Sequence, residues 1–173
     1  MSHRSLLLLG LLISQSQHGY QIHDFIEKNL TYITTMKKAT AYSLLDKLSK
    51  EQYIDVSIEY DGNRPPRKVY SINKKGTEYF QKLLMQNLAS AETATYKNEI
   101  GFMFLDHLPK EQTMNLLKKK QSELEEKYKA LNKVPNHEEK GINIAFLHKK
   151  KMLEAEISFI TEIIDKLVLT GVN

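Results

Sequence analysis

The segment Lys37-Lys38-Ala39-Thr40-Ala41-Tyr42-Ser43-Leu44-Leu45-Asp46-Lys47-Leu48 decides the fold of this chain. Its apolar residues recur with the spacing of one helical face, which predicts a helix over residues 37–50. The other face offers cations and hydroxyls that can reach phosphates and base edges, from Lys37, Lys38, Thr40, Ser43 and Lys47. A solvated surface helix shows the same pattern, so the helix alone does not decide the function.

The residues that follow predict a β-hairpin. Residues 53–60 and 68–72 are rich in Val, Ile and Tyr, as strands are. The turn between them contains Gly and Asn, which tolerate a positive φ, and two prolines that stiffen it. Arg64, Arg67 and Lys68 are therefore expected near a stiff tip that probes phosphates or a minor groove. A basic helix beside a basic hairpin predicts a winged helix-turn-helix.

The distribution of charge supports a polyanion-binding module. Residues 1–85 hold 12 Lys and Arg against 8 Asp and Glu, whereas residues 86–173 hold 13 of each. The whole net charge of +4 therefore lies in the first half, next to a neutral scaffold. The apolar fraction of 41% is typical of a globular protein. The absence of cysteine excludes disulfides and thiolate chemistry and fits a cytoplasmic protein.

The N-terminal residues predict further helices. Residues 5–14 are apolar on all sides, which predicts a buried helix. This run is too short to span a membrane and has no small-x-small cleavage site after it, so no signal peptide is expected. Residues 15–18 are expected to be a polar connector, and residues 20–28 an amphipathic helix. Asn73 is expected to cap a helix that links the two halves.

Four segments occur in a characteristic order and spacing: Leu8-Leu9-Gly10-Leu11-Leu12, His18-Gly19-Tyr20-Gln21-Ile22, Thr40-Ala41-Tyr42-Ser43-Leu44-Leu45-Asp46-Lys47-Leu48, and Arg67-Lys68-Val69-Tyr70-Ser71-Ile72-Asn73-Lys74-Lys75-Gly76. Through them, residues 5–84 resemble the DNA-binding domain of the phenolic acid decarboxylase regulator (PadR) family. The resemblance implies a dimeric transcription factor, usually a repressor. It also implies that Tyr42 and the basic residues of the wing contact DNA.

Three positions depart from that family. Ser43 stands where proline is usual, and Ala39 and Gln52 stand where glycine is common. Ser43 keeps its N–H group and a hydroxyl, so the helix should persist, although the base preference near it can differ. Gln52 leaves the turn into the first wing strand open.

The second half of the chain predicts helices and no strands. Tyr96, Ile100 and Met103 would share one helical face, and Pro109 fits a first helical position. Asn136, with Glu139 three residues later, is a capping-box pattern for the last helix. Two runs, Lys118-Lys119-Lys120 and Lys149-Lys150-Lys151, are expected to be solvated faces.

The long apolar stripes of this half predict a dimerisation domain. Helices of this length have few partners within one small chain, so we expect them to pack with a second copy. Two recognition helices about 34 Å apart would then read the half-sites of a palindromic operator. The expected dimer contacts are Leu8, Leu12, Phe146, Leu153, Ile157, Ile160, Ile164 and Leu167.

No residue set in the sequence predicts catalysis. The six histidines lack a metal-ligand spacing, and there is no phosphate loop or nucleophile elbow. We therefore expect no enzymatic activity, no cofactor and no metal. In related regulators ligands bind between the two domains, which makes Tyr96, Phe102 and Met103 candidate linings of an effector pocket. Ordinary core packing explains the same residues.

These observations predict a mainly α fold with a small β-hairpin. Residues 1–88 would form a winged helix-turn-helix DNA-binding domain, and residues 89–173 an α-helical dimerisation domain with a candidate effector site. The expected function is a homodimeric, sequence-specific transcriptional repressor released by a small aromatic or hydrophobic effector, with no membrane partner. The alternative is a winged-helix protein-interaction module without DNA readout, against which the charge distribution argues.

Overall fold

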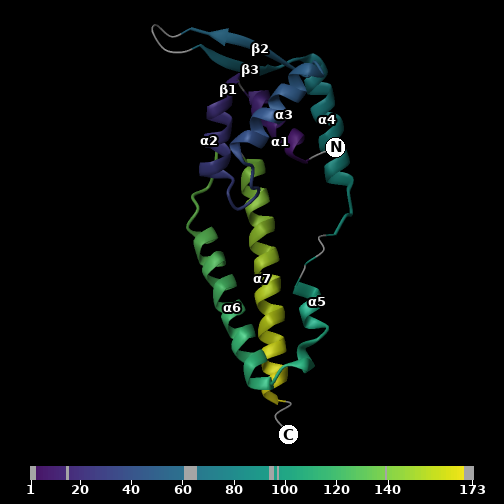
Figure 1. Ribbon diagram of the computed structural model, residues 1–173, viewed down its shortest axis with the longest axis vertical. Coiled ribbons are helices and arrows are strands. Elements are labelled where there is room, and N and C mark those ends of the chain that lie inside the picture. The colour runs from purple at the N-terminus through teal and green to yellow at the C-terminus, as the bar shows by residue number, and fades with distance from the viewer. Residues whose placement is uncertain are drawn as a thin grey trace. The chain divides into compact units, whose positions relative to one another are not determined.

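The computed structural model divides the chain into two compact units, Met1–Glu92 and Thr93–Asn173 (Figure 1). Among the described residues, no helix has the length and apolar character needed to cross a membrane. The residues that the structure describes are 3–14, 16–60, 66–93, 96, 98–138 and 140–169.

The N-terminal unit consists of helices around a small antiparallel sheet. Its elements in chain order are α1 (His3–Ser14), β1 (Gln17–His18), α2 (Gly19–Asn29), α3 (Lys38–Lys50), β2 (Ile54–Glu59), β3 (Arg67–Ile72) and α4 (Lys74–Ala89). The sheet has the order β1-β3-β2, and β2 and β3 form the predicted hairpin (Figure 1). The predicted mainly helical fold with a β-hairpin is confirmed.

One prediction for this unit is wrong. Residues 17 and 18, expected in a polar connector, form a short third strand in which Gln17 pairs with Tyr70 and His18 pairs with Val69. Two residues are too few to show an alternating pattern, so their strand character depends on the neighbour that supplies the hydrogen bonds.

The helix α1 is enclosed by the rest of this unit. It packs against α3, α4 and β3, and Leu8 and Leu9 have no exposed surface. A Cβ at Gly10 would lie 3.1 Å from Cε2 of Phe80 on α4, so glycine allows the two helices to approach closely. Leu8 and Leu12, which were predicted to contact a second copy, both lie in the core of their own unit, and that contact stays a prediction.

The turn before β2 is held by the start of α4. Asn73 caps α4 as predicted, because its side chain accepts a hydrogen bond of 3.0 Å from the Gly76 N–H. The Asn73 amide also donates to the Gln52 carbonyl at 3.2 Å. Gln52 has a φ of 62°, a left-handed conformation that glycine adopts more readily. The turn into β2, which the sequence left open, therefore forms with Gln52 in a glycine-like conformation.

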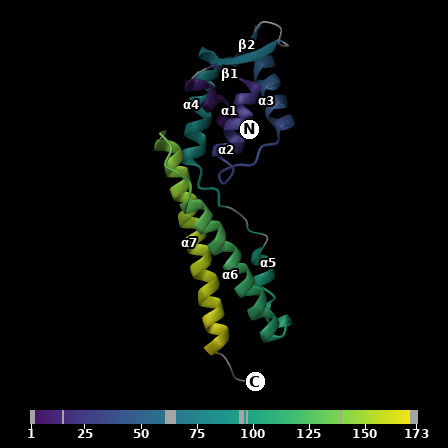
Figure 2. The same ribbon diagram turned by 90° about the vertical axis from the view of Figure 1, so that its left-hand side faces the viewer.

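The C-terminal unit is an α-helical hairpin with a short helix beside it. Its elements are α5 (Asn98–Phe102), a 3₁₀ turn (Leu105–His107), α6 (Lys110–Asn132) and α7 (Lys140–Leu169). The long helices run in opposite directions and pack side by side (Figures 1 and 2). Pro109 is the residue before α6 and not its first residue. The Glu139 of the predicted capping box lies outside the described residues. Instead, Asn143 exchanges two hydrogen bonds with the His137 backbone, at 2.8 and 2.7 Å.

The apolar stripes of α6 and α7 pack against each other within one chain. Leu117, Leu124 and Leu131 of α6 form a core with buried residues of α7. Six of the expected dimer contacts lie on α7. Ile157 and Leu167 are half-buried and pack against this core. The other four belong to the core itself: Phe146, Leu153, Ile160 and Ile164. The helix α6 of the same chain thus covers much of this stripe, and the contact of these residues with a second copy stays a prediction.

Candidate DNA-binding surface and ligand cavity

The helix α3 presents the predicted polar face to solvent. Ala41, Leu45 and Leu48 are buried, whereas Ser43 and Lys47 are exposed. Lys38 begins the helix and Lys37 precedes it as an exposed N-cap residue, and Thr40 is half-buried. A groove-binding helix needs this arrangement, in which one side is anchored in the protein and the other side offers donors.

Tyr42 lies partly inside the protein. Its ring packs over the start of α2, so closely that a Cβ at Gly19 would be 2.6 Å from Cε1 of Tyr42. Tyr70 of β3 also lies close to this position, since the same Cβ would be 3.2 Å from its Cε2. Burial, with smaller contributions from Asp46 and Tyr42, raises the pKa of the Tyr70 hydroxyl. Tyr42 therefore joins α2, α3 and the wing, and only part of its side chain is available to DNA.

Two of the predicted wing residues lie at the start of β3. The Arg67 guanidinium carbon is 5.7 Å from the centre of the Tyr20 ring, within the range of a cation–π contact. The Lys68 ammonium is 3.5 Å from Oδ1 of Asp46 on α3. Arg64, the third predicted wing contact, lies outside the described residues. The exposed Lys68–Asp46 pair links the wing to the recognition helix.

Two polar residues near the wing were not singled out from the sequence. Nε2 of His18 lies 3.0 Å from Oε2 of Glu59, so that the pair spans β3 from β1 to β2. The His18 ring also stacks on Tyr20, with 5.4 Å between ring centres. The presence of His18 and Tyr20 in one family-like segment was the available signal, whereas the partner Glu59 left no signal in the sequence.

A basic hollow of about 560 Å³ adjoins the start of α3. Its lining combines cations with threonine hydroxyls, from Arg4, Thr34, Thr35, Lys37, Lys38 and Thr40. Donors and cations around a helix N-terminus favour phosphate groups. The hollow therefore extends the candidate DNA-binding surface beyond the exposed face of α3.

One group on α2 has the spacing of a cation site. The ligand atoms of His23, Asp24 and Glu27 lie within 4.8 Å of one another. The spacing of the histidines alone did not predict this group of three possible ligands. Asp24 pairs with Lys28 at 3.7 Å, and Nδ1 of His23 lies 3.7 Å from Glu27. These are ordinary pairs on a helix surface, and nothing else at this place points to an ion.

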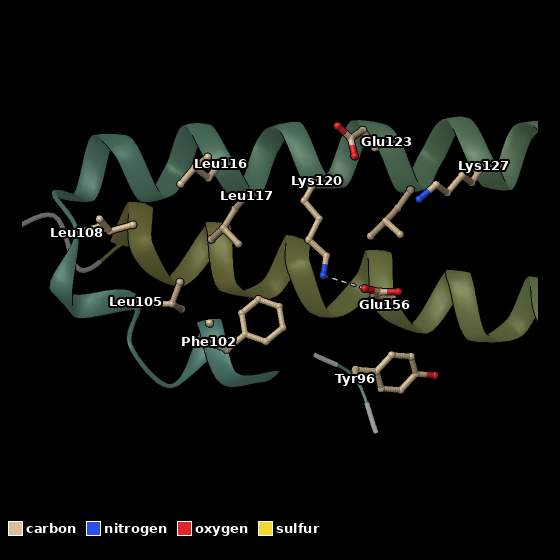
Figure 3. A pocket seen from close by; sticks show the side chains of 12 residues that line it. Tyr96, Phe102, Leu105, Leu108, Leu116, Leu117, Lys120, Glu123, Lys127 and Glu156 are labelled. Carbon is tan, nitrogen blue, oxygen red and sulfur yellow. Dashed lines mark ion pairs between the residues drawn. The ribbon is translucent and has the colours of Figure 1, made fainter. Parts of the chain in front are cut away.

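A cavity of about 610 Å³ lies between α5, α6 and α7 (Figure 3). Tyr96 and Phe102, two of the predicted effector contacts, line it. Met103, the third, lines neither this cavity nor its neighbour and is 74% exposed. The neighbouring cavity of about 330 Å³ shares Tyr96, Phe102 and Glu156 with the first. The predicted common face of Tyr96, Ile100 and Met103 does not form, because α5 ends at Phe102.

An ion pair crosses the cavity between the two long helices. The Lys120 ammonium lies 2.9 Å from Oε1 of Glu156 and 5.0 Å from the centre of the Phe102 ring. Phe102 in turn meets Phe159 edge-on, with 5.3 Å between ring centres. Lys120 was expected on a solvated face with Lys118 and Lys119, and that expectation is wrong for Lys120, whose side chain is 23% exposed.

These features define a winged-helix unit followed by a helical C-terminal unit. Residues 8–82 match the Transcriptional regulator PadR-like family. The family is one of regulators and not of enzymes.

The comparisons with individual proteins agree with this assignment. The chain is similar to the Negative transcriptional regulator PadR of Bacillus subtilis (strain 168), with 23% identity over 111 residues, 64% of this chain and 61% of that protein. It thus spans about three fifths of that relative's length. Among solved structures, Bacillus subtilis PadR in complex with operator DNA has a TM-score of 0.81 at 18% identity, covering 94% of this chain and 98% of the other. Bacillus subtilis PadR in complex with p-coumaric acid has a TM-score of 0.80 at 17% identity, covering 94% and 97%.

Proposed function

We propose that this protein is a homodimeric, sequence-specific DNA-binding repressor that acts in the cytoplasm and is released by a small molecule. Residues 1–88 would bind DNA, and residues 89–173 would dimerise and hold the effector. The observation that carries the proposal is the outward polar face of α3 next to the basic start of β3, with Arg67 and Lys68. The similar proteins support it, since one is named a negative regulator and one was solved with operator DNA.

Phosphate contacts from this surface would supply most of the affinity. Each neutralised phosphate releases counterions, so affinity should fall steeply with salt. The first test is a gel shift of the DNA upstream of the protein's own gene at two salt concentrations. Affinity that barely changes from low to physiological salt would rule out this mechanism.

Paired variants locate the contacts. Arg67→Ala with Lys68→Ala should weaken DNA binding and reduce the salt dependence, because two cations leave the surface. The matched control is Lys118→Ala with Lys119→Ala, two exposed lysines of α6. Equal effects of the two double variants would show that the wing cations make no specific contribution to DNA binding. If the unchanged protein shifts no DNA, the alternative function as a protein-interaction module is favoured.

The exposed side chains of α7 offer further candidates for the proposed dimer contact. The apolar side chains of α7 that remain exposed are Ile144, Leu147, Met152, Phe159, Val168 and Leu169. Exposed apolar clusters mark interaction sites, so this outer face is the better candidate for contact with a second copy. Ile144→Glu with Leu147→Glu should shift the mass measured by light scattering toward the monomer. An unchanged mass would place the interface elsewhere.

The cavity between α5, α6 and α7 is the proposed effector site. Its size falls within the range of small-molecule sites, and aromatic and aliphatic side chains line most of it. The complex of the Bacillus subtilis protein with p-coumaric acid supports control by a small aromatic or hydrophobic molecule. A ligand that releases the DNA fragment in the gel shift would establish this part of the proposal.

A further inference from the structure

The cavity between α5, α6 and α7 has an aliphatic end and a polar end (Figure 3). Leu105, Leu108, Leu116 and Leu117 gather at one end of the view, whereas the other end holds polar groups. The charged residues of the lining are two lysines and two glutamates, Lys120, Lys127, Glu123 and Glu156. Their formal charges cancel, so the lining as a whole attracts neither anions nor cations.

The one cation placed in the middle of the cavity is already enclosed. The Lys120 nitrogen is buried between the Glu156 carboxylate at 2.9 Å and the Phe102 ring at 5.0 Å. A ligand in the cavity therefore meets the methylene groups of Lys120 and the ring of Phe102 before it meets the charge. Figure 3 shows the side chain descending from α6 to Glu156 on α7, with the Phe102 ring below it.

A ligand carboxylate could reach the Lys120 ammonium only by displacing Glu156. The Glu156 side chain is 30% exposed, so displacement would leave a largely buried carboxylate without its cation. Removing one partner of such a pair costs much more than the pair itself contributes. An uncharged ligand leaves the pair intact and still covers the aliphatic wall.

We propose that this cavity binds an uncharged, largely apolar small molecule that carries at most a hydroxyl, carbonyl or amide group at the polar end. The inference rests on the proposed function, in which this cavity is the effector site. It gives the effector a chemical class that differs from the carboxylic acid bound by the Bacillus subtilis protein.

Matched probes test the charge of the ligand directly. Calorimetry with the full chain at neutral pH would compare p-coumaric acid with its methyl ester, and octanoate with 1-octanol. The uncharged member of each pair should bind at least about tenfold more tightly, since a carboxylate either breaks the Lys120–Glu156 pair or shares the polar end with the carboxylates of Glu123 and Glu156. Equal or tighter binding of the acids, or no binding by any of the four probes, would overturn the proposal.

Two glycines provide a matched pair of variants that test the location. Gly101 lines the cavity, and a Cβ there would meet no atom within 4 Å, so Gly101→Leu adds an apolar side chain at the cavity wall. Gly141 on α7 has equally open surroundings but does not line the cavity. Gly101→Leu should weaken binding of the uncharged probes at least about tenfold, and Gly141→Leu should leave it unchanged. Retained binding in Gly101→Leu, or equal loss in both variants, would place the ligand elsewhere.

A variant at a second residue of the cavity wall tests the same site if Gly101→Leu misfolds. Leu116 is 53% exposed, so Leu116→Gln adds a polar group to the aliphatic end without disturbing the buried core. It should weaken the uncharged probes several-fold while circular dichroism shows unchanged helix content. Unchanged affinity in a folded Leu116→Gln protein would contradict the proposed site.

Gel shifts without ligand separate this inference from the proposed function. The unchanged protein and Gly141→Leu should shift operator DNA equally. If neither shifts DNA, the proposed function fails while calorimetry still decides the ligand class. If both shift DNA and the uncharged probes do not bind, only the ligand inference fails.

Discussion

The turn at Gln52 predicts that a single glycine would stabilise the N-terminal unit. Gln52 has a φ of 62°, and the left-handed region costs a residue with a Cβ about 1–2 kcal/mol. Glycine avoids that cost but gains about 0.5–1 kcal/mol of freedom in the unfolded chain. The difference leaves Gln52→Gly more stable by about 0–1.5 kcal/mol, with a central value of about 0.75 kcal/mol.

No described hydrogen bond of this turn would be lost in Gln52→Gly. The Gln52 N–H donates to the Ser49 carbonyl at 2.9 Å, and its carbonyl accepts from Asn73. Both are backbone groups of Gln52, and they remain in the variant. The side chain is exposed, so its removal uncovers no core. The stabilisation should therefore be close to the full backbone difference.

Urea unfolding followed by circular dichroism measures the effect. The midpoint should rise in Gln52→Gly, with the slope unchanged. The control is Gln81→Gly at an exposed position of α4, where glycine should cost about 0.8–1.0 kcal/mol. If both variants lowered the midpoint alike, the left-handed turn would not be the feature that distinguishes Gln52.

Two further predictions concern one residue in each unit. Gly19→Ala should destabilise the protein by about 1–3 kcal/mol and weaken DNA binding, because the new methyl group collides with Tyr42; an unchanged thermal midpoint and gel shift would contradict this. Glu154 accepts hydrogen bonds from Lys151 and Tyr128, which hold the pKa of its carboxyl below the ordinary value of 4.5. The folded state therefore gains stability above pH 4.5 and loses it as the pH falls through the lowered value. Glu154→Gln should lower the urea midpoint at pH 7 and have a smaller effect at pH 3, and an equal effect at both would refute the assignment.

The N-terminal unit was predictable because its signals are local. The stripe of α3 and the Asn73 cap each depend on residues within a few positions, and both formed as expected. The strand β1 was not predictable, because Gln17 and His18 become a strand only when β3 supplies hydrogen bonds. The left-handed turn at Gln52 could be suspected only from the glycine common in the family.

In the C-terminal unit, the periodicity of the apolar residues predicts that they are buried but not which helix covers them. The stripes that contain Leu124 and Leu153 were read correctly as buried, but the same spacing suits a partner from the same chain or from another. Only some of the residues that line the cavity could be predicted from the sequence. Tyr96 and Phe102 stood out as aromatic residues, whereas Lys120 lay in a run of lysines and Glu156 far along the chain. Their pairing depends on the antiparallel register of the two long helices.

The α6–α7 hairpin has a consequence for how the chain can change in evolution. Leu117, Leu124 and Leu131 lie seven residues apart, so losing one residue would turn the rest of α6 by about 100° and expose the stripe. The pairs Gln121–Thr161 and Tyr128–Glu154 tie the helices at matching levels. Insertions that survive should therefore come as whole heptads in both helices, each lengthening the hairpin by about 10 Å. Relatives of this protein would then differ in arm length by discrete steps, while the face of each helix stays the same.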